Sequence, residues 1–238
     1  MAAIELTDLI KHYKQGKNVV RALDGVSLTI ESGEFVAVVG RSGSGKTTML
    51  DLLGLLLRPT SGRVVIDGRD TGKLRDGARA TMRGERIGFI FQEFNLLPTL
   101  NAIENVMLPL RYRRGKDPEG RARALRLMEE VDLADRLEHR PGELSGGQAQ
   151  RVAIARSMIN NPALVLGDEP TGEVDSETSM QLLDLMRRMN QERGVTFVIV
   201  THDMDVANRA DRIIRLKDGK VASDERITPT AHAEPASA

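Results

Sequence analysis

Short apolar runs recur along the chain in two different patterns. Residues 4–13 (IELTDLIKHY) and 19–30 (VVRALDGVSLTI) alternate apolar and polar positions, which predicts antiparallel strands with one buried face. Residues 34–40 (EFVAVVG), 163–170 (ALVLGDEP) and 196–203 (TFVIVTHD) are continuously apolar up to their polar ends. Such continuous runs are typical of parallel strands that are buried on both faces of a sheet.

The remaining segments complete an α/β pattern. Residues 62–68 (GRVVIDG) and 86–92 (RIGFIFQ) predict further strands, and residues 176–193 predict a helix between two of the buried runs. Residues 212–225 predict a closing hairpin with its turn at Asp218-Gly219. The sequence holds one set of these parts and no second copy.

Two regions differ in composition from this core. Residues 98–142 are helical and charged in pattern, which indicates an inserted helical subdomain. Residues 227–238 (ITPTAHAEPASA) are small, polar and proline-containing. We therefore expect a disordered tail over residues 224–238, after a single domain that spans residues 1–223. We therefore predict an α/β fold with a mainly parallel core sheet, an N-terminal antiparallel β subdomain and an inserted α-helical subdomain.

Composition narrows the class of protein. The 238 residues include 34 Lys+Arg and 34 Asp+Glu, and aromatic residues make up only 3%. A nucleic-acid-binding protein usually has a basic excess and rings that stack on bases, so we expect no nucleic-acid partner. Cysteine is absent, which excludes disulfides and thiolate chemistry. We see no signal peptide and no apolar run near the ~20 residues that cross a bilayer, so we expect a cytoplasmic enzyme.

The segment GRSGSGKT, residues 40–47, fits the phosphate-loop pattern G-x-x-x-x-G-K-[ST]. Glycines let backbone N–H groups turn inward around a phosphate, while Lys46 supplies positive charge and Thr47 offers a hydroxyl to Mg²⁺. An accidental glycine turn is the alternative, but the valine-rich strand before it and the apolar helix after it are the required context. We predict a P-loop NTPase whose nucleotide site includes Gly40, Arg41, Ser42, Gly43, Ser44, Gly45, Lys46, Thr47 and Thr48.

Polar residues end three of the apolar strands. Asp168 and Glu169 end one, Gln92 ends a second and His202 ends a third. Ligands of open α/β sheets bind outside the carboxyl ends of strands, so these side chains should converge with Lys46 on one rim. We predict that Thr47, Gln92 and Asp168 hold Mg²⁺, and that Glu169 is the general base. A solvated acidic loop and a purely structural His202 are the alternatives.

The stretch LSGGQAQRVAIARS, residues 144–157, opens a helix on two adjacent glycines, which are poor helix formers. One interpretation is structural, with Ser145 as the N-cap and the glycines in a tight turn. The other is that free N–H groups of Gly146 and Gly147 bind an anion at the helix N-terminus.

The chain resembles the ATP-binding subunits of ABC transporters over about residues 4–222. The segments IGFIFQEFNLLPTLNAIENVMLPL (87–110) and RVAIARSMINNPALVLGDEPTG (151–172) are similar to the lipoprotein-release, macrolide-efflux and cell-division branch. The family resemblance is carried, in order, by GRSGSGKT, Gln92, LSGGQ (144–148), LVLGDEP (164–170), GEVD (172–175) and VTHD (200–203).

This resemblance implies a head-to-tail homodimer that holds two ATP molecules between its subunits. In such a dimer Ser145, Gly146 and Gly147 would meet the γ-phosphate of ATP on the partner's P-loop, and Gln148 would belong to the same nucleotide site. Tyr13 matches the aromatic residue that stacks on adenine, with Val20 beside the base, and His202 and Gln92 match catalytic positions. Asp175 matches the loop that crosses the interface. The resemblance further implies an integral membrane permease that docks near Gln92–Leu110 and holds the chain at the inner face of the membrane.

Some positions depart from the family pattern. Glu173-Val174 stands where a small or amide residue followed by leucine is more frequent, Gly167 where alanine is frequent, and Ala149 where glutamine is frequent. An extra carboxylate near the magnesium site could weaken coupling between the two ATP sites. The favoured function is the ATPase subunit of an exporter or extractor. A regulatory ATPase of a non-transporting membrane complex and a soluble DNA-repair or translation ABC protein are the alternatives.

Overall fold

The computed structural model describes residues 2–16, 18–113, 115 and 117–227. Six strands form the core sheet in the order β10-β9-β3-β8-β7-β6. Strands β9, β3, β8, β7 and β6 run parallel, and β10 is antiparallel to β9, so the predicted mainly parallel sheet is confirmed. The strands are β3 (Phe35–Val39), β6 (Ile87–Ile90), β7 (Leu164–Asp168), β8 (Thr196–Thr201), β9 (Arg212–Lys217) and β10 (Lys220–Arg226).

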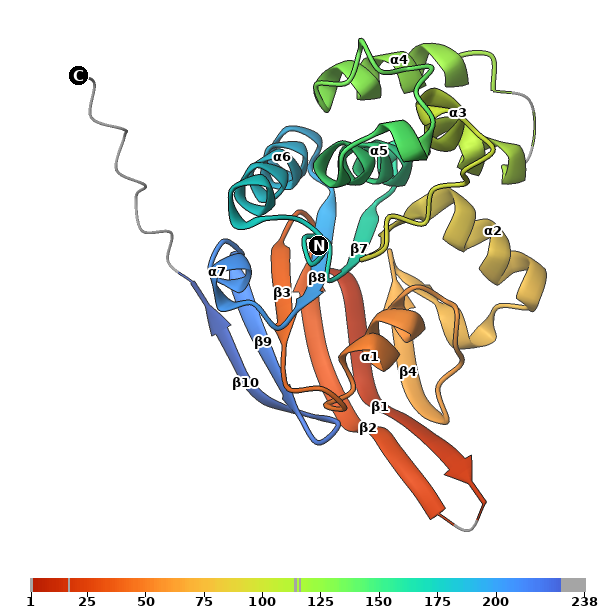
Figure 1. Ribbon diagram of the computed structural model, residues 1–238. Coiled ribbons are helices and arrows are strands. Elements are labelled where there is room, and N and C mark those ends of the chain that lie inside the picture. The colour runs from red at the N-terminus through yellow and green to blue at the C-terminus, as the bar shows by residue number, and fades with distance from the viewer. Residues whose placement is uncertain (1, 17, 114, 116, 228–238) are drawn as a thin grey trace.

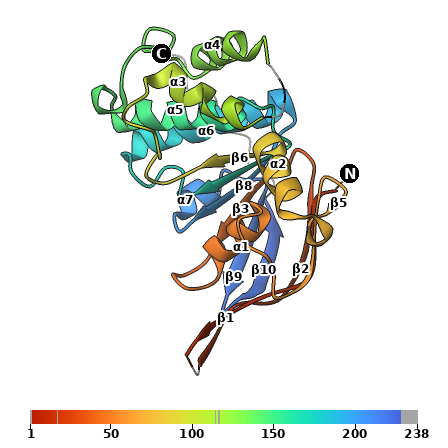
Figure 2. The same cartoon turned by 90° about the vertical axis from the view of Figure 1, so that its right-hand side faces the viewer.

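A second, antiparallel sheet has the order β2-β1-β4-β5, as the alternating N-terminal pattern predicts. Its longest pair is a hairpin that extends beyond the body of the domain in both views (Figures 1 and 2). The register of that hairpin places Tyr13 opposite Val20. The strands are β1 (Ala2–Gln15), β2 (Asn18–Glu31), β4 (Ser61–Ile66) and β5 (Arg69–Asp70).

The core sheet is buried on both faces. In β3, Phe35, Ala37 and Val39 contribute to the core beneath α3–α6, whereas Val36 and Val38 contribute to the core shared with α1 and the antiparallel sheet. Figure 2 shows α3, α4, α5 and α6 gathered on one side of the sheet. The helices are α1 (Lys46–Leu53), α2 (Asp76–Arg86), α3 (Ala102–Met107), α4 (Gly120–Glu130), α5 (Gly146–Met158), α6 (Ser176–Arg193) and α7 (Met204–Ala207), with 3-10 turns η1 (Thr71–Lys73), η2 (Leu108–Tyr112) and η3 (Pro141–Glu143).

The helices of segment 98–142 do not enclose a core of their own. Buried residues of α3 and α4 belong to the same hydrophobic cluster as α5, α6 and one face of the sheet. The segment therefore packs as a layer of the same domain. Among the described residues, no helix is both long and apolar enough to cross a bilayer.

Two element boundaries and one helix differ from the sequence predictions. Strand β6 ends at Ile90, two residues before Gln92. Strand β10 continues to Arg226, so the predicted tail begins too early at residue 224: Arg212 donates two hydrogen bonds of 2.6 Å to Asp224 and holds the strand in place. Helix α2 was not predicted at all. Residues 228–238 lie outside the described residues.

Candidate nucleotide-binding site

The phosphate loop between β3 and α1 needs its glycines for steric reasons. A Cβ atom on Gly40 would lie 2.4 Å from the Leu216 carbonyl oxygen, and one on Gly45 would lie 2.3 Å from the Ala22 carbonyl oxygen. Gly45 also has a φ of 105°, in the left-handed region that favours glycine. The Lys46 ammonium donates to the carbonyl oxygens of Gly40 (2.8 Å) and Arg41 (3.2 Å), so it folds back over the loop.

A cleft of about 730 Å³ brings most of the predicted site residues together. Gly40, Arg41 and Ser44 belong to the loop but do not line this cleft. Ser44 is buried (5% exposed), and a Cβ atom on Gly40 would clash with its side chain. Sequence reasoning missed Arg21, Ala22 and Val200, for which the sequence carries no motif. The predicted residues that line the cleft are Tyr13, Val20, Ser42, Gly43, Gly45, Lys46, Thr47, Thr48, Gln92, Asp168, Glu169 and His202.

Glu169 is held by both its backbone and its side chain. Its φ is 47°, a conformation that is uncommon for a residue with a Cβ and that is often found at functional sites. The His202 Nδ1 atom lies 2.8 Å from each carboxylate oxygen of Glu169. This hydrogen bond and the negative charge of Glu169 raise the pKa of His202 above its ordinary value.

Asp168 lies half-buried at the end of β7. Burial raises the pKa of its carboxyl group, and the neighbouring charges of Glu169 and Asp51 raise it further, whereas Lys46 acts in the opposite direction. A carboxylate in such surroundings gains stability from a nearby cation. Together with the Thr47 hydroxyl and the Gln92 amide, it forms a set of oxygen donors of the kind that Mg²⁺ prefers when it also binds nucleotide phosphates. These residues therefore fit the metal.

Gln92 lies in the loop after β6, and its conformation depends on contacts far away in sequence. Its Nε2 atom donates to Glu173 Oε1 at 2.8 Å. Two residues further on, Phe94 and Asn95 have φ values of 58° and 49°. The buried Arg156 donates to both of their carbonyl oxygens, at 2.6 Å to that of Phe94. Desolvation lowers the pKa of Arg156 to about 10.

The residues that open α5 form a capping box. Ser145 Oγ accepts from the Gln148 backbone N–H at 3.3 Å, and Gln148 Oε1 accepts from the Ser145 backbone N–H at 2.9 Å. Asp175 is the N-cap of α6 and accepts a hydrogen bond of 2.9 Å from the Thr178 backbone N–H, which lowers the pKa of Asp175. Ser145 is therefore the N-cap of α5, as the structural interpretation predicts, but Gly146 and Gly147 are the first residues of the helix and not a separate tight turn.

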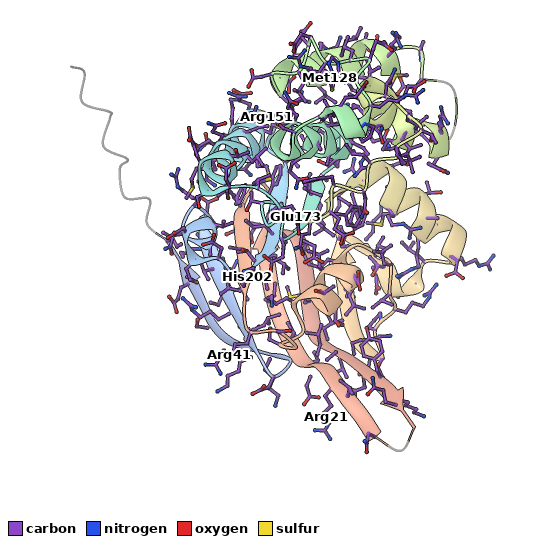
Figure 3. All side chains as sticks on the ribbon, in the orientation of Figure 1. Arg21, Arg41, Met128, Arg151, Glu173 and His202 are labelled. Carbon is purple, nitrogen blue, oxygen red and sulfur yellow. The ribbon has the colours of Figure 1, made fainter. Side chains whose placement is uncertain are left out.

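The same residues also line a pocket of about 360 Å³, which we call the signature pocket: Ser145, Gly146, Gly147, Gln148, Arg151, Glu173, Val174, Asp175, Thr178 and Gln181. None of these residues lines the cleft at the phosphate loop. The chain thus presents two separate polar pockets (Figure 3 labels Arg151 and Glu173 of one, and His202 of the other).

A glycine phosphate loop on a buried strand, with acidic residues at the end of a distal strand, defines a P-loop nucleotide-binding protein. Residues 23–172 match the family described as "ABC transporter". The chain belongs to this family and carries its ATP-binding domain, as the sequence motifs predict.

Relatives with known names agree with this assignment. The chain is 51% identical over 223 residues to the macrolide export ATP-binding/permease protein MacB of Syntrophobacter fumaroxidans, covering 93% of this chain and 31% of that protein. It is 48% identical to the uncharacterized ABC transporter ATP-binding protein MJ0796 of Methanocaldococcus jannaschii, covering 94% and 97%. A dimeric post-hydrolysis structure of MJ0796 with ADP and Pi matches with a TM-score of 0.86 at 45% identity, covering 95% and 99%.

Proposed function

We propose that this chain is the ATP-hydrolysing subunit of a membrane transporter, that two copies close head-to-tail around two ATP molecules with Mg²⁺, and that closure drives a permease. The similarity to a macrolide exporter favours export or extraction as the direction. Closure is a population shift, because nucleotide held between two subunits stabilises the closed dimer over the open form.

The observation that carries this proposal is the presence of two separate pockets on one chain. The cleft with Lys46 holds the groups that bind and attack a nucleotide, and the signature pocket offers the N-terminus of α5 to an anion. The two pockets share no lining residue, so each offers its own contacts to a nucleotide. A second copy in head-to-tail orientation would complete each site. The dimeric structures of the MJ0796 cassette support a dimer.

Within each site the residues have distinct roles in this proposal. Tyr13 and Val20 contact the base, and the phosphate loop with Lys46 binds the phosphates. Thr47, Gln92 and Asp168 hold Mg²⁺, which neutralises phosphate charge when bound. Glu169 accepts a proton from the attacking water. His202, which is hydrogen-bonded to Glu169 in this structure, moves to the γ-phosphate.

The experiment that tests this function is the variant Glu169→Gln. It removes the base but keeps the shape of the side chain, so ATP should bind and hydrolysis should fall by about 10²–10⁴-fold. Gel filtration with ATP and Mg²⁺ should then show a stable dimer. A variant that stays monomeric with ATP and hydrolyses it normally would contradict the proposal.

The permease is expected at an apolar groove of about 570 Å³ beside the segment Gln92–Leu110. Phe91 and Leu108 line it, and its rim exposes Tyr112 (79%) and Leu56 (51%). Large exposed apolar side chains around a groove are typical of interaction sites. This groove would receive a short apolar segment of the permease.

A charge placed on the groove tests this docking. Tyr112→Glu should weaken association with membranes from the organism that encodes the chain by about tenfold or more, while the isolated chain keeps its ATPase activity. Val19→Glu is the matched control, because Val19 is 54% exposed on the β1–β2 hairpin, away from the groove. Equal membrane association of both variants would exclude the groove as the docking site.

A further inference from the structure

Glu173 connects the two pockets of the chain. It lies four residues after Glu169, in the loop that joins β7 to α6, and it lines the signature pocket. Its Oε1 atom accepts a hydrogen bond of 2.8 Å from Nε2 of Gln92, which lines the nucleotide cleft. This bond joins residues that are 81 positions apart in the chain.

The loop is shaped to make this contact. The Gly172 backbone N–H donates to the Glu169 carbonyl oxygen at 3.0 Å, which closes a turn directly after the predicted base. A Cβ atom on Gly172 would lie 3.5 Å from both Cγ and Nε2 of Gln92, so the loop passes close to that side chain. Glu173 therefore meets Gln92 from a backbone that is already placed beside it.

The chemistry of the two groups fixes the orientation of the amide. An ionised carboxylate only accepts hydrogen bonds, and the NH₂ group of a glutamine only donates them. Because the NH₂ group of Gln92 faces Glu173, the carbonyl oxygen is the end of the amide that stays available to the cleft. That oxygen is the atom that a hard cation such as Mg²⁺ would bind.

We propose that Glu173 is a positioning residue for Gln92: its carboxylate holds the amide NH₂ and thereby presents the carbonyl oxygen of Gln92 to Mg²⁺ in the nucleotide cleft. This inference rests on the proposed role of Gln92 as a magnesium ligand. Without an acceptor at position 173 the Gln92 amide turns freely. Mg²⁺ then binds only the orientation that presents the carbonyl oxygen, so its apparent affinity is lower.

The test compares Glu173→Ala, which removes the acceptor, with Glu173→Gln, whose side-chain carbonyl can accept the same bond without the charge. All variants carry Glu169→Gln, so that nucleotide is bound but not turned over. A fluorescent ATP analogue is titrated at a series of Mg²⁺ concentrations and without Mg²⁺. The exposed Glu177 is the matched control, because Glu177→Ala removes a nearby negative charge that lines neither pocket.

We expect Glu173→Ala to raise the Mg²⁺ concentration for half-maximal binding by about three- to tenfold, the range of one exposed hydrogen bond to a charged group. Binding without Mg²⁺ should stay unchanged, which a general structural defect would not allow. Glu173→Gln should restore most of the Mg²⁺ dependence, and Glu177→Ala should leave it unaltered. In the Gln92→Ala background, Glu173→Ala should have no further effect.

The outcomes separate the two levels of inference. If Gln92→Ala leaves the Mg²⁺ dependence unchanged, the role of Gln92 as a ligand fails. If Gln92→Ala alters it and Glu173→Ala does not, only the positioning role of Glu173 fails. A Glu173→Gln variant as defective as Glu173→Ala overturns the positioning role as well, because the charge of Glu173 and not its hydrogen bond would then be responsible.

Discussion

A carboxylate at the N-terminus of α5 should prevent closure of the dimer without preventing nucleotide binding. Gly146 is the suitable position. An ideal Cβ there meets its nearest neighbour, the Glu173 carbonyl oxygen, at 3.5 Å, whereas one on Gly147 would lie 2.6 Å from the methyl group of Thr178. The field of the helix favours aspartate in its first turn by about 0.3–1 kcal/mol, so Gly146→Asp should fold.

The size of the effect follows from Coulomb's law. Two unit charges ~4 Å apart repel by about 1 kcal/mol in water and by about 4 kcal/mol at an effective dielectric constant of 20. A closed homodimer would contain this repulsion twice, or at least about 2 kcal/mol in total, and every 1.4 kcal/mol is about tenfold. ATP-dependent dimerisation of Gly146→Asp should therefore weaken by about 30-fold or more. Gly146→Ala, which adds size without charge, and Gly142→Asp, which adds charge in open space outside the pocket, are the controls.

A capture assay distinguishes action across the interface from action within one chain. A tagged Lys46→Ala chain is mixed with ATP and with either the unaltered chain or Gly146→Asp, all in the Glu169→Gln background. If the signature pocket acts on the partner's nucleotide, both partners complete one intact site with the tagged chain and are captured equally. If it acts on its own nucleotide, Gly146→Asp is not captured. That second result would refute the head-to-tail reasoning.

Two further predictions concern side chains that fix the site. The pKa of His202, followed by NMR, should lie above its ordinary value of about 6.5 and return toward it in Glu169→Gln. Because the pKa is raised in the folded protein, the stabilisation from the His202–Glu169 pair is fully present below pH ~6.5 and is lost as the pH rises through the folded pKa. An unshifted titration of His202 would contradict the contact. Arg156→Met should lower the free energy of unfolding by about 1–3 kcal/mol, since it removes the hydrogen bonds from the buried guanidinium to the partly buried carbonyl groups of Phe94 and Asn95. Denaturant unfolding measures this, and a loss below about 0.5 kcal/mol would show that the loop keeps its conformation without Arg156.

The elements that sequence patterns predicted well are those whose burial follows from the local order of apolar and polar residues. Strands β3, β7 and β8 are continuous apolar runs, and each is buried on both faces, so the pattern and the environment agree. The closing hairpin was equally predictable, since Asp218 and Gly219 adopt the positive φ values of 49° and 74° that this turn requires.

Helix α2 could not be found in this way because its inner face is partly built from arginine. Arg79 is 4% exposed and donates to the carbonyl oxygens of Leu57 (2.7 Å) and Thr71 (3.4 Å), groups that only the folded chain brings together. An apolar-periodicity search counts such a residue as solvated. The same limit applies to the site: motifs pointed to Gln92 and Glu169, but their contacts with Glu173 and His202 depend on tertiary structure.

The contacts around the cleft explain why nucleotide binding would rearrange it. Lys46 is bound to backbone carbonyl groups, His202 is bound to Glu169, and Asp168 has a raised pKa because burial and its acidic neighbours disfavour its charge. Each of these groups has a better partner in a phosphate or a cation than in its present surroundings. Binding of nucleotide with Mg²⁺ would release Lys46 and His202 toward the phosphates and free the Glu169 carboxylate for water. In the proposed function, the cleft that binds the nucleotide would thereby become the cleft that hydrolyses it.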